Sequence, residues 1–230
     1  MEPTDENALK PIASVDLVVL ALSEHGLQVL LIRRQADPFR GAWALPGGWI
    51  HTDEDPDLDA AAARVSREKT GVETPYLEQL ATFGSAGRDP RGWSVSVGYV
   101  ALLPADEVAG RAAESTDTAW HAVTGDGVAV PLAFDHASIL RAGLIRLRAK
   151  VEYTSLPVHL LPAGFTLGEL QAVYERILGR RLDKSAFRKR IAEVDFVEPV
   201  PSAMRRGSNR PAQIYRVKPG LGTAFFDRTI

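Results

Sequence analysis

Apolar positions along the chain alternate in some segments and recur at helical spacing in others. Two apolar runs, 16–22 and 27–33, are joined by Ser-Glu-His-Gly, which is typical of a β-hairpin. A further apolar run at 95–103 predicts another strand. Residues 60–71 form an alanine-rich helical pattern closed by a glycine, and another helical stripe begins after Asp135, whose side chain can cap a helix. The first part of the chain is therefore expected to mix strands and helices.

The positions of proline and glycine predict where this first part of the chain ends. Residues 151–164 contain two prolines and predict a connector or a short strand. Thr166 and Glu169 then form a capping-box pattern, and apolar residues recur at helical spacing until Gly179. We therefore expect three parts, namely a disordered N-terminal tail at 1–11, a first domain at 12–151 and a second domain at 152–230.

Residues 166–217 have the order of elements of a winged helix-turn-helix. Asp183 is expected to cap a second helix, with Phe187 and Ile191 on its buried side. Two short strands, 196–200 and 213–217, then surround a basic loop at 201–211. The polar residues expected to contact DNA from this helix and loop are Lys184, Ser185, Arg188, Lys189, Arg190, Arg205, Arg206, Asn209 and Arg210.

Composition excludes several classes of protein. The chain has 230 residues, 45% of them hydrophobic, which is enough for a substantial core. No apolar run approaches the roughly 20 residues that span a bilayer, and Met1–Lys10 is polar and acidic, unlike a signal segment. The absence of cysteine excludes disulfides and thiolate metal sites. We expect a cytoplasmic protein that does not bind membranes.

Charge is divided unevenly along the chain. The formal net charge is -2, yet residues 152–230 carry 13 Lys and Arg against 8 Asp and Glu. The basic second half predicts an anionic partner, and the clustering of its cations favours double-stranded DNA. We expect Arg188 and Lys189 at base edges and the loop arginines at phosphates. The alternative is a winged helix that binds protein, with basic residues that only solubilise its surface.

One segment of the first half carries the pattern of a magnesium-dependent pyrophosphatase. Residues 47–54 and 64–72 resemble the Nudix hydrolase box, which ends in Arg-Glu-apolar-x-Glu-Glu-x-Gly-apolar. On a helix, positions i, i+3 and i+4 share one face, where three carboxylates can hold a hard cation. Here that face carries Val65, Glu68 and Lys69, whose charges sum to zero. We therefore expect that the metal site is lost.

The spacing of the box also departs from the pattern. Nine residues rather than seven separate Glu54 from Arg64, and a serine replaces an apolar residue. Glu54 and Glu68 are expected to be vestigial, with no catalytic residue and no enzyme activity. The alternative is an active magnesium-dependent pyrophosphatase for ADP-ribose or NADH, in which these two act with another carboxylate, such as Glu114 or Asp117. Taken alone, the segment also fits an ordinary surface helix.

Two loops beside the box have the composition of a nucleotide site. The stretch 37–48 contains glycines that permit close approach of a phosphate and aromatic rings that can contact a base or ribose. The loop 87–93 offers an arginine fork for a diphosphate, although a solvated turn has similar composition. Both loops resemble those of ADP-ribose-type Nudix domains. The residues expected to bind the ligand are Phe39, Arg40, Trp43, Leu45, Pro46, Gly47, Gly48, Asp89 and Arg91.

A degenerate Nudix box followed by a winged helix resembles the NrtR family, Nudix-related transcriptional regulators of NAD metabolism. The resemblance covers nearly the whole chain and includes 132–136, 161–170, 177–184 and 187–188. It implies an α+β fold, in which a Nudix-like α/β/α sandwich precedes a C-terminal winged helix-turn-helix domain. It also implies a bacterial homodimer that represses genes of NAD biosynthesis or salvage at a palindromic operator. ADP-ribose, or a related NAD-derived nucleotide, is the implied effector that releases the DNA, and no cofactor is expected.

Overall fold

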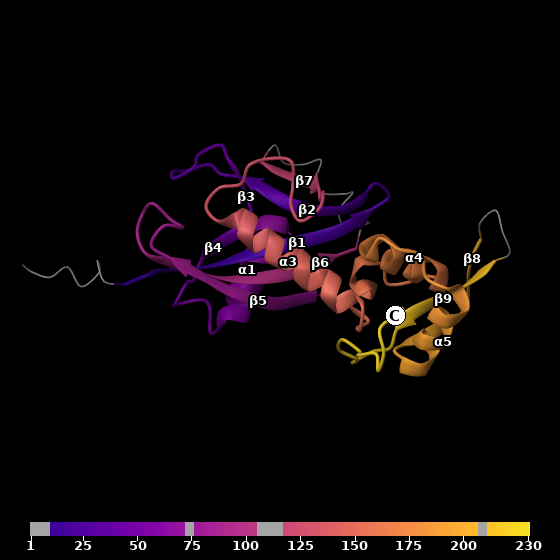
Figure 1. Cartoon of the computed structure of the whole chain (residues 1–230). Coiled ribbons are helices and arrows are strands. Elements are labelled where there is room, and N and C mark those ends of the chain that lie inside the picture. Colours follow the sequence, from indigo (N-terminus) through magenta and orange to yellow (C-terminus); the bar gives the residue numbers. More distant parts are fainter. Residues whose placement is uncertain (1–9, 72–75, 105–116, 207–210) are drawn as a thin grey trace, which may run out of the picture.

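The computed structural model describes residues 10–71, 76–104, 117–206 and 211–230. Its elements form a larger unit of sheet and helices and a smaller C-terminal unit (Figure 1). The larger unit consists of β1 (Ile12–Ser23), β2 (Gly26–Arg33), β3 (Trp43–Ala44), β4 (Gly47–Trp49), α1 (Leu58–Thr70), β5 (Tyr76–Ser85), β6 (Ser94–Leu103), β7 (Thr118–Ala122) and α3 (His136–Val151). The smaller unit consists of the 3-10 helix η2 (Leu156–Leu160), α4 (Leu167–Leu178), α5 (Lys184–Val194), β8 (Val197–Arg205) and β9 (Ala212–Val217).

A mixed seven-stranded sheet forms the centre of the larger unit. Its main strand order is β3-β2-β1-β6-β5, while β4 also pairs with β1 and β7 with β2. β1 and β6 are parallel, from Ile12 opposite Ser94 to Ala21 opposite Leu103. The other paired strands are antiparallel. A parallel pair of this kind is normally covered on both faces, which agrees with its continuous apolar sequence.

The side chains of β1 determine which helix covers which face of the sheet. Alternate side chains of a strand point to opposite faces. Leu17 and Val19 pack in the apolar cluster that contains Val65 of α1, whereas Val18 and Leu20 pack in the cluster that contains the buried residues of α3. The two helices therefore enclose the sheet from opposite sides (Figure 1). The predicted α/β/α sandwich is confirmed.

The predicted hairpin and box helix are also present. β1 and β2 pair antiparallel, with Ser23 opposite Gly26 at the turn. Helix α1 follows Asp57, whose carboxylate accepts a hydrogen bond from the Ala60 N–H at 2.8 Å. The helix ends at Gly71 with a φ of 70°, a left-handed conformation that glycine adopts without a steric penalty.

The prediction that the Asp135 side chain caps α3 is wrong. Asp135 does precede the helix, but within the described part of the chain its side chain makes no capping hydrogen bond. Its two oxygens instead accept hydrogen bonds from Arg88 at 2.9 and 3.0 Å. Hydrogen bonds between ionised groups are roughly twice as strong as neutral ones. Asp135 therefore belongs to an ion pair rather than to the helix end.

The smaller unit is a winged helix with the predicted helix boundaries. The Thr166 hydroxyl accepts from the Glu169 N–H, and the Glu169 carboxylate accepts from the Thr166 N–H, which confirms the capping box. Gly179 ends α4 in a left-handed conformation. Asp183 caps α5 by accepting a hydrogen bond from the Ala186 N–H at 2.8 Å.

Two segments of this unit differ from the prediction. The connector 151–164 contains the 3-10 helix η2 in place of a possible strand, with Pro157 in its first turn, where a missing N–H is tolerated. Part of the expected loop at 201–211 belongs to β8, which extends to Arg205. A register shift with Ser202 at a φ of 58° lets the strand continue beyond the bulge.

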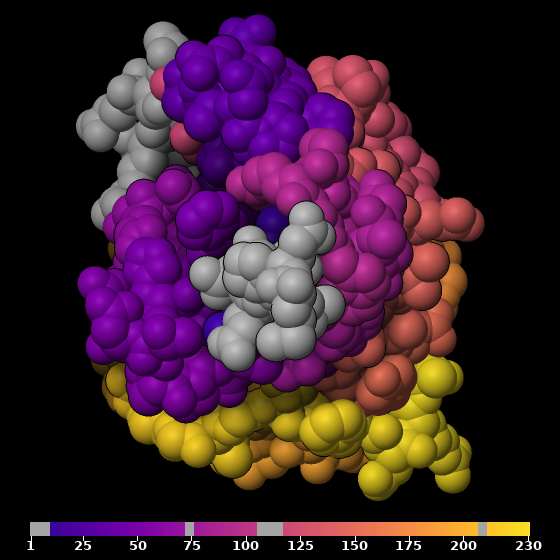
Figure 2. All heavy atoms as spheres, turned by 90° about the vertical axis from the view of Figure 1, so that its left-hand side faces the viewer, coloured from indigo at the N-terminus to yellow at the C-terminus, as the bar shows by residue number. Residues whose placement is uncertain are grey.

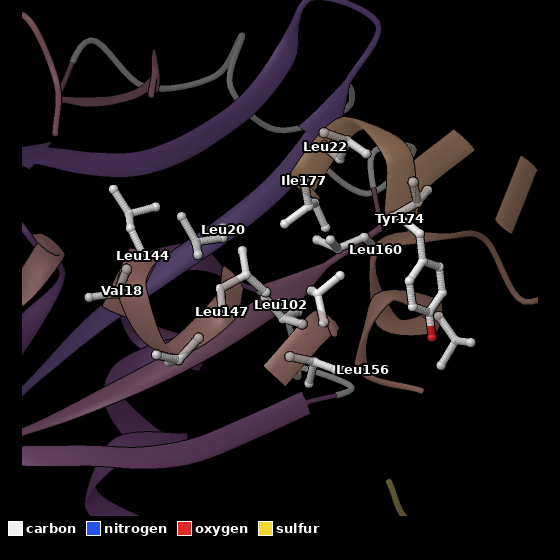
Figure 3. Packing of buried hydrophobic residues seen from close by; sticks show 14 of the residues in the cluster. Val18, Leu20, Leu22, Leu102, Leu144, Leu147, Leu156, Leu160, Tyr174 and Ile177 are labelled. Atoms are coloured by element: carbon white, nitrogen blue, oxygen red, sulfur yellow. The ribbon is translucent and has the colours of Figure 1, made fainter. Parts of the chain in front are cut away.

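One apolar cluster runs through both units. In Figure 3, Leu20 of β1, Leu102 of β6 and Leu147 of α3 lie next to Leu160 of η2, and the packing continues to Ile177 of α4. The winged helix is therefore packed against the sheet unit through a shared core, not joined to it by a linker alone. In the ranges that the structure describes, none of the helices has the length and apolar character of a membrane span.

Candidate ligand pocket and nucleic-acid interface

A cavity of about 250 Å³ lies where β1, β2 and β4 meet the loop before β6 and the start of α3. Figure 2 views the molecule from this end, and indigo atoms of β1 are visible at depth between the purple and magenta surfaces. The cavity combines charged, aromatic and glycine residues. The lining residues that the chemistry depends on are Asp16, Arg34, Arg88, Arg91, Phe134 and His136.

Asp16 is a buried carboxylate at this cavity. Its side chain is 8% exposed, and one oxygen accepts hydrogen bonds from the Ser96 hydroxyl at 2.6 Å and from Arg88 at 3.4 Å. Gly47 makes this position possible, because a Cβ on Gly47 would lie 2.1 Å from Asp16 Oδ1. The neighbouring carboxylate therefore requires a glycine at this position.

Arg88 and His136 join this carboxylate to the start of α3. The Arg88 side chain is 6% exposed and binds both oxygens of Asp135. His136 Nδ1 accepts a hydrogen bond from the Leu45 N–H at 2.9 Å, so the ring proton is at Nε2, which lies 3.5 Å from Asp16 Oδ1. Burial lowers the pKa of His136 and thereby favours the neutral ring. The cavity wall and the beginning of α3 thus form one connected network.

Two arginines face the cavity from its rim. Arg91 donates to Asp89 through Nε at 3.0 Å and through a terminal nitrogen at 2.7 Å, and its guanidinium carbon lies 5.5 Å from the centre of the Trp49 ring. The Arg34 guanidinium carbon lies 4.6 Å from the centre of the Phe134 ring. Burial and the nearby charge of Arg91 lower the pKa of Arg34. An anionic ligand such as a diphosphate would stabilise the charged form of Arg34.

Two phenylalanines at the same rim have a strained backbone conformation. Phe39 and Phe134 contact each other edge to face, with ring centres 4.9 Å apart. Their φ values are 65° and 55°, a left-handed conformation that is uncommon for residues other than glycine. Such residues cost about 1–3 kcal/mol each and cluster at ligand sites. Their contact at the cavity rim supports its assignment as a binding site.

The structure brings several of the predicted ligand residues to this cavity. Those that line it are Leu45, Gly47, Gly48, Asp89 and Arg91. Pro46 lies within the same loop, and its carbonyl accepts a hydrogen bond from the Leu17 N–H at 2.8 Å. The loop is therefore fixed to β1 by its backbone.

The other predicted ligand residues have different neighbours. Phe39 reaches the cavity rim through its contact with a lining aromatic ring. Trp43 packs against His121 of β7, with ring centres 4.7 Å apart. Arg40 lies 3.8 Å from Asp37, and its side chain is 67% exposed. The cavity-facing cation of this loop region is Arg34, which the sequence analysis did not select.

Nine lining residues were not predicted from the sequence, and the five of them on which the chemistry depends are Asp16, Arg34, Arg88, Phe134 and His136. They come from β1, the residue after β2, the loop before β6 and the start of α3, so their spacing along the chain carries no shared pattern. Asp16 had one visible signal, because it is a charged residue at the start of an otherwise apolar run. An ionisable group in a buried strand normally has a partner or a function.

Two of the three helix positions that carry carboxylates in the Nudix pattern hold Val65 and Lys69. Val65 is fully buried, and a Cβ on Gly48 would lie 2.9 Å from Val65 Cγ2. Arg64 donates two hydrogen bonds of 2.8 Å to Asp55 and one of 3.2 Å to Glu68. The hydrogen-bonded Arg64 lowers the pKa of the Asp55 carboxyl to about 2. Asp55 and Glu68 are thus both bound to the Arg64 guanidinium.

The remaining donors do not complete a magnesium site. Glu54 lies 3.1 Å from His51 and is 60% exposed, and Lys69 is exposed on α1. Glu114 lies outside the described residues, whereas Asp117 immediately precedes β7. Among the described residues, no group of three or more His, Asp or Glu side chains could hold a metal ion. Within the described ranges, the residues at the box do not offer the several oxygen ligands that magnesium requires.

The second candidate site is the outer face of α5. Phe187 and Ile191 are buried, which turns the basic side of the helix outward. The predicted DNA-contacting residues that are exposed on this helix are Lys184, Ser185, Arg188 and Lys189. Arg190 is different, because its side chain is only 23% exposed and donates a hydrogen bond of 3.0 Å to the Arg228 carbonyl.

The wing residues are also not equivalent. Arg205 pairs with Glu169, the capping-box residue of α4, and so ties the hairpin to that helix. Arg206 is exposed. Asn209 and Arg210 lie outside the described residues. Arg205 therefore has a structural partner in addition to its expected role at DNA.

Two family models match the chain. Residues 11–141 match the NUDIX domain, and residues 157–217 match the NrtR DNA-binding winged helix domain. The ADPR responsive transcriptional repressor NtrR of Acinetobacter baylyi is 43% identical over 206 residues, which cover 90% of this chain and 82% of that protein. An ADP-ribose pyrophosphatase of Methanocaldococcus jannaschii is 33% identical over 134 residues, which cover 58% of this chain and 73% of that protein.

Two solved structures are similar in fold and sequence. Shewanella oneidensis NrtR complexed with a 27mer DNA has a TM-score of 0.87 and 37% identity, and the match covers 95% of this chain and 99% of that chain. The NUDIX domain of the same protein complexed with ADP ribose has a TM-score of 0.51 and 35% identity, and it covers 63% of this chain and 94% of that chain.

Proposed function

The chain belongs to the NrtR family, and from this premise we propose that it is a DNA-binding transcriptional repressor with ADP-ribose as its effector. One observation carries the proposal: a cationic cavity and an exposed basic helix occur in one chain and share one apolar core. A repressor of this kind needs both sites and a physical connection between them.

The cavity supports ADP-ribose through charge and shape. Arg34 and Arg91 line the cavity and would bind the diphosphate from its rim. Gly47 and Gly48 line the cavity, and Phe134 offers a flat surface to a base or ribose. Contacts from Phe39, Arg40 and Trp43 remain predictions of the sequence.

The winged helix supports recognition of duplex DNA. Helix α5 would enter the major groove, with Arg188 and Lys189 at base edges and Arg206 at phosphates. A homodimer would bring two such helices to a palindromic operator. We expect that operator to control genes of NAD biosynthesis or salvage, as the family resemblance implies. ADP-ribose would change the relative placement of the two winged helices and so release the operator.

We infer that the box no longer hydrolyses nucleotides. The second candidate function, an active pyrophosphatase, is motivated by the similarity to the Methanocaldococcus jannaschii enzyme. Hydrolysis in this fold family depends on magnesium, and the face that would bind it carries Val65 and Lys69. Incubation with ADP-ribose and magnesium is expected to release no AMP above a buffer control. Rapid AMP release that Glu68→Gln abolishes would favour the enzyme instead.

The test of repression is a titration of operator DNA. The upstream regions of the chain's own gene and its neighbours would be searched for a shared palindrome, and the labelled fragment titrated by fluorescence anisotropy at several salt concentrations. Binding is expected to weaken with salt, and saturating ADP-ribose is expected to weaken it by about tenfold or more. Operator affinity that ADP-ribose leaves unchanged would refute the proposed effector. Salt-independent binding, or none, would favour a protein-binding winged helix.

A further inference from the structure

The last residues of the chain lie between the two functional sites. Residues 224–230, which we call the strap, follow β9 and pass between the end of α3 and helix α5 (Figure 1). Neither family model extends over this segment, since the winged-helix match ends at residue 217. The strap nevertheless makes hydrogen bonds and ring contacts both to the residues after α3 and to the helix-turn-helix.

On one side the strap pairs with the residues that follow α3. The Ser155 N–H donates to the Ala224 carbonyl at 2.9 Å, and the Ala224 N–H donates to the Ser155 hydroxyl at 2.9 Å. The Phe226 N–H donates to the Tyr153 carbonyl at 2.8 Å. Further along, the Ile230 N–H donates to the carbonyl of the residue after α3 at 2.8 Å. The strap thus forms a short ladder of hydrogen bonds with residues 152–155.

On the other side the strap contacts the helix-turn-helix. The Phe226 side chain is 7% exposed and lies 6.3 Å, centre to centre, from the rings of both Tyr174 on α4 and Phe196 after α5. Arg190 of α5 donates to the Arg228 carbonyl at 3.0 Å, and Arg180 in the turn donates to the carbonyl of the last strap residue at 2.9 Å. The orientation of α5 is therefore fixed in part by the strap.

Helix α3 connects the strap to the cavity. Its first residue, His136, and the preceding Asp135 belong to the cavity network, while Val151 at its other end is fully buried in the shared core. A helix of 16 residues is about 24 Å long and moves largely as a rigid rod. A displacement at the cavity would consequently reach residues 152–155, to which the strap is hydrogen-bonded.

We propose that the strap is a positioning element that couples the cavity to the DNA-reading helix. Occupancy of the cavity shifts α3, the strap follows the end of α3, and Arg180, Phe226 and Arg190 transfer the shift to α5. The inference rests on the proposed function, because it names the route by which the effector reaches the operator-binding face. Coupling of this kind is a free energy shared by both ligands, so it can be measured from either side.

A direct contact between the sheet unit and the winged helix could also couple the cavity to α5. Helix α4 packs directly on the β1–β2 hairpin, where Arg176 donates to the Ser23 carbonyl at 2.9 Å. If this contact carried the coupling, the strap would only add stability. The experiment must therefore separate the two routes.

The first comparison uses adjacent phenylalanines. Phe226→Ala removes the buried ring, whereas Phe225→Ala removes a ring that is 64% exposed and serves as the matched control. For each full-length variant, operator affinity is measured by anisotropy with and without saturating ADP-ribose, and ADP-ribose affinity is measured on the DNA-free protein. We expect Phe226→Ala to reduce the ADP-ribose-induced fold-change to about twofold or less, from about tenfold or more in the wild type and the control. ADP-ribose affinity of the free protein should stay within about twofold of the wild type, because the cavity is untouched.

The second comparison uses adjacent arginines and does not create a cavity. Arg180→Gln removes the hydrogen bond to the strap and an ion pair with Glu152 at 3.6 Å, while Arg181→Gln removes the same charge from a side chain that is 96% exposed. Arg176→Gln tests the hairpin route. We expect the fold-change to fall by about threefold or more in Arg180→Gln and to remain unchanged in the other two. Thermal unfolding of every variant identifies loss of fold.

The outcomes separate the two proposals. The strap would not be the coupling element if Arg180→Gln and Arg181→Gln gave equal fold-changes and Arg176→Gln gave a reduced one. The contact between α4 and the β1–β2 hairpin would then carry the coupling. Wild-type protein that binds ADP-ribose without any change in operator affinity would refute the proposed function, and the strap with it. A wild-type response that is lost only in Phe226→Ala and Arg180→Gln would support both.

Discussion

Arg88 binds both carboxylate oxygens of Asp135 at 2.9 and 3.0 Å, and this pair joins the wall of the cavity to the first turn of α3. The Arg88 side chain is 6% exposed, so its charge depends on protein partners rather than water. Asp16 is the other carboxylate near it, at 3.4 Å. The arrangement makes the start of α3 sensitive to anything that binds Arg88.

Replacement of Asp135 by asparagine is expected to destabilise the protein. The substitution leaves the buried Arg88 with one distant carboxylate, and we expect a loss of about 2 kcal/mol in the free energy of unfolding. Urea denaturation of both proteins measures the difference. Asp37→Asn is the control, because Asp37 is 81% exposed and 3.8 Å from Arg40, and it should change stability by less than about 0.5 kcal/mol. Equal stabilities of the two variants would contradict the structural role of the Arg88–Asp135 pair.

Arg34 is expected to contribute more to ligand affinity than Arg40 does. Arg34 lines the cavity beside Phe134, whereas the Arg40 side chain is 67% exposed and lies near Asp37. Calorimetric titration should show that Arg34→Ala weakens ADP-ribose binding by about tenfold or more, equivalent to about 1.4 kcal/mol, since a charge-assisted contact is removed. Arg40→Ala should remain within about twofold of the wild type. The reverse order would restore the prediction made from the sequence.

Arg188 is expected to determine operator choice. It is exposed on α5, and Arg188→Gln should weaken operator binding by about tenfold while affecting random DNA less. Arg206→Gln should instead lower affinity for all DNA sequences. It should also reduce the slope of the logarithm of the binding constant against the logarithm of salt concentration by about one. Arg216→Gln is a suitable control on β9, because that arginine pairs with Glu198 in the same hairpin. Identical losses on operator and random DNA for Arg188→Gln would place it at phosphates.

The Asp55–Arg64 pair predicts a specific loss of stability in acid. Its hydrogen-bonded Arg64 lowers the pKa of Asp55 from 3.8 to about 2 in the folded protein. A lowered carboxyl pKa contributes stability that is present above pH about 4 and lost as the pH falls towards about 2. Unfolding measured across this range should show a steeper loss for the wild type than for Asp55→Asn, which lacks the titrating group. Parallel curves would show that this pair does not stabilise the fold.

Local sequence was sufficient to predict where several helices, strands and turns of this protein begin and end. The hairpin of β1 and β2, the end of α1 at Gly71 and the capping box of Thr166 and Glu169 all follow from turn and cap chemistry within a few residues. Helical periodicity also identified the buried side of α5, and with it the exposed basic side. These features depend on neighbours in sequence, so their signals are complete within one segment.

Tertiary structure alone decided how the site is assembled. Asp16, Arg88 and His136 come from a strand, a loop and a helix, and Asp135, which looks like a helix cap by local rules, is recruited by Arg88 from 47 positions away. The strap is likewise defined by its hydrogen bonds to residues 152–155 and not by a motif of its own. A buried charge is stabilised by whichever partner the fold places beside it, and that choice depends on the packing of distant segments, which no local spacing encodes.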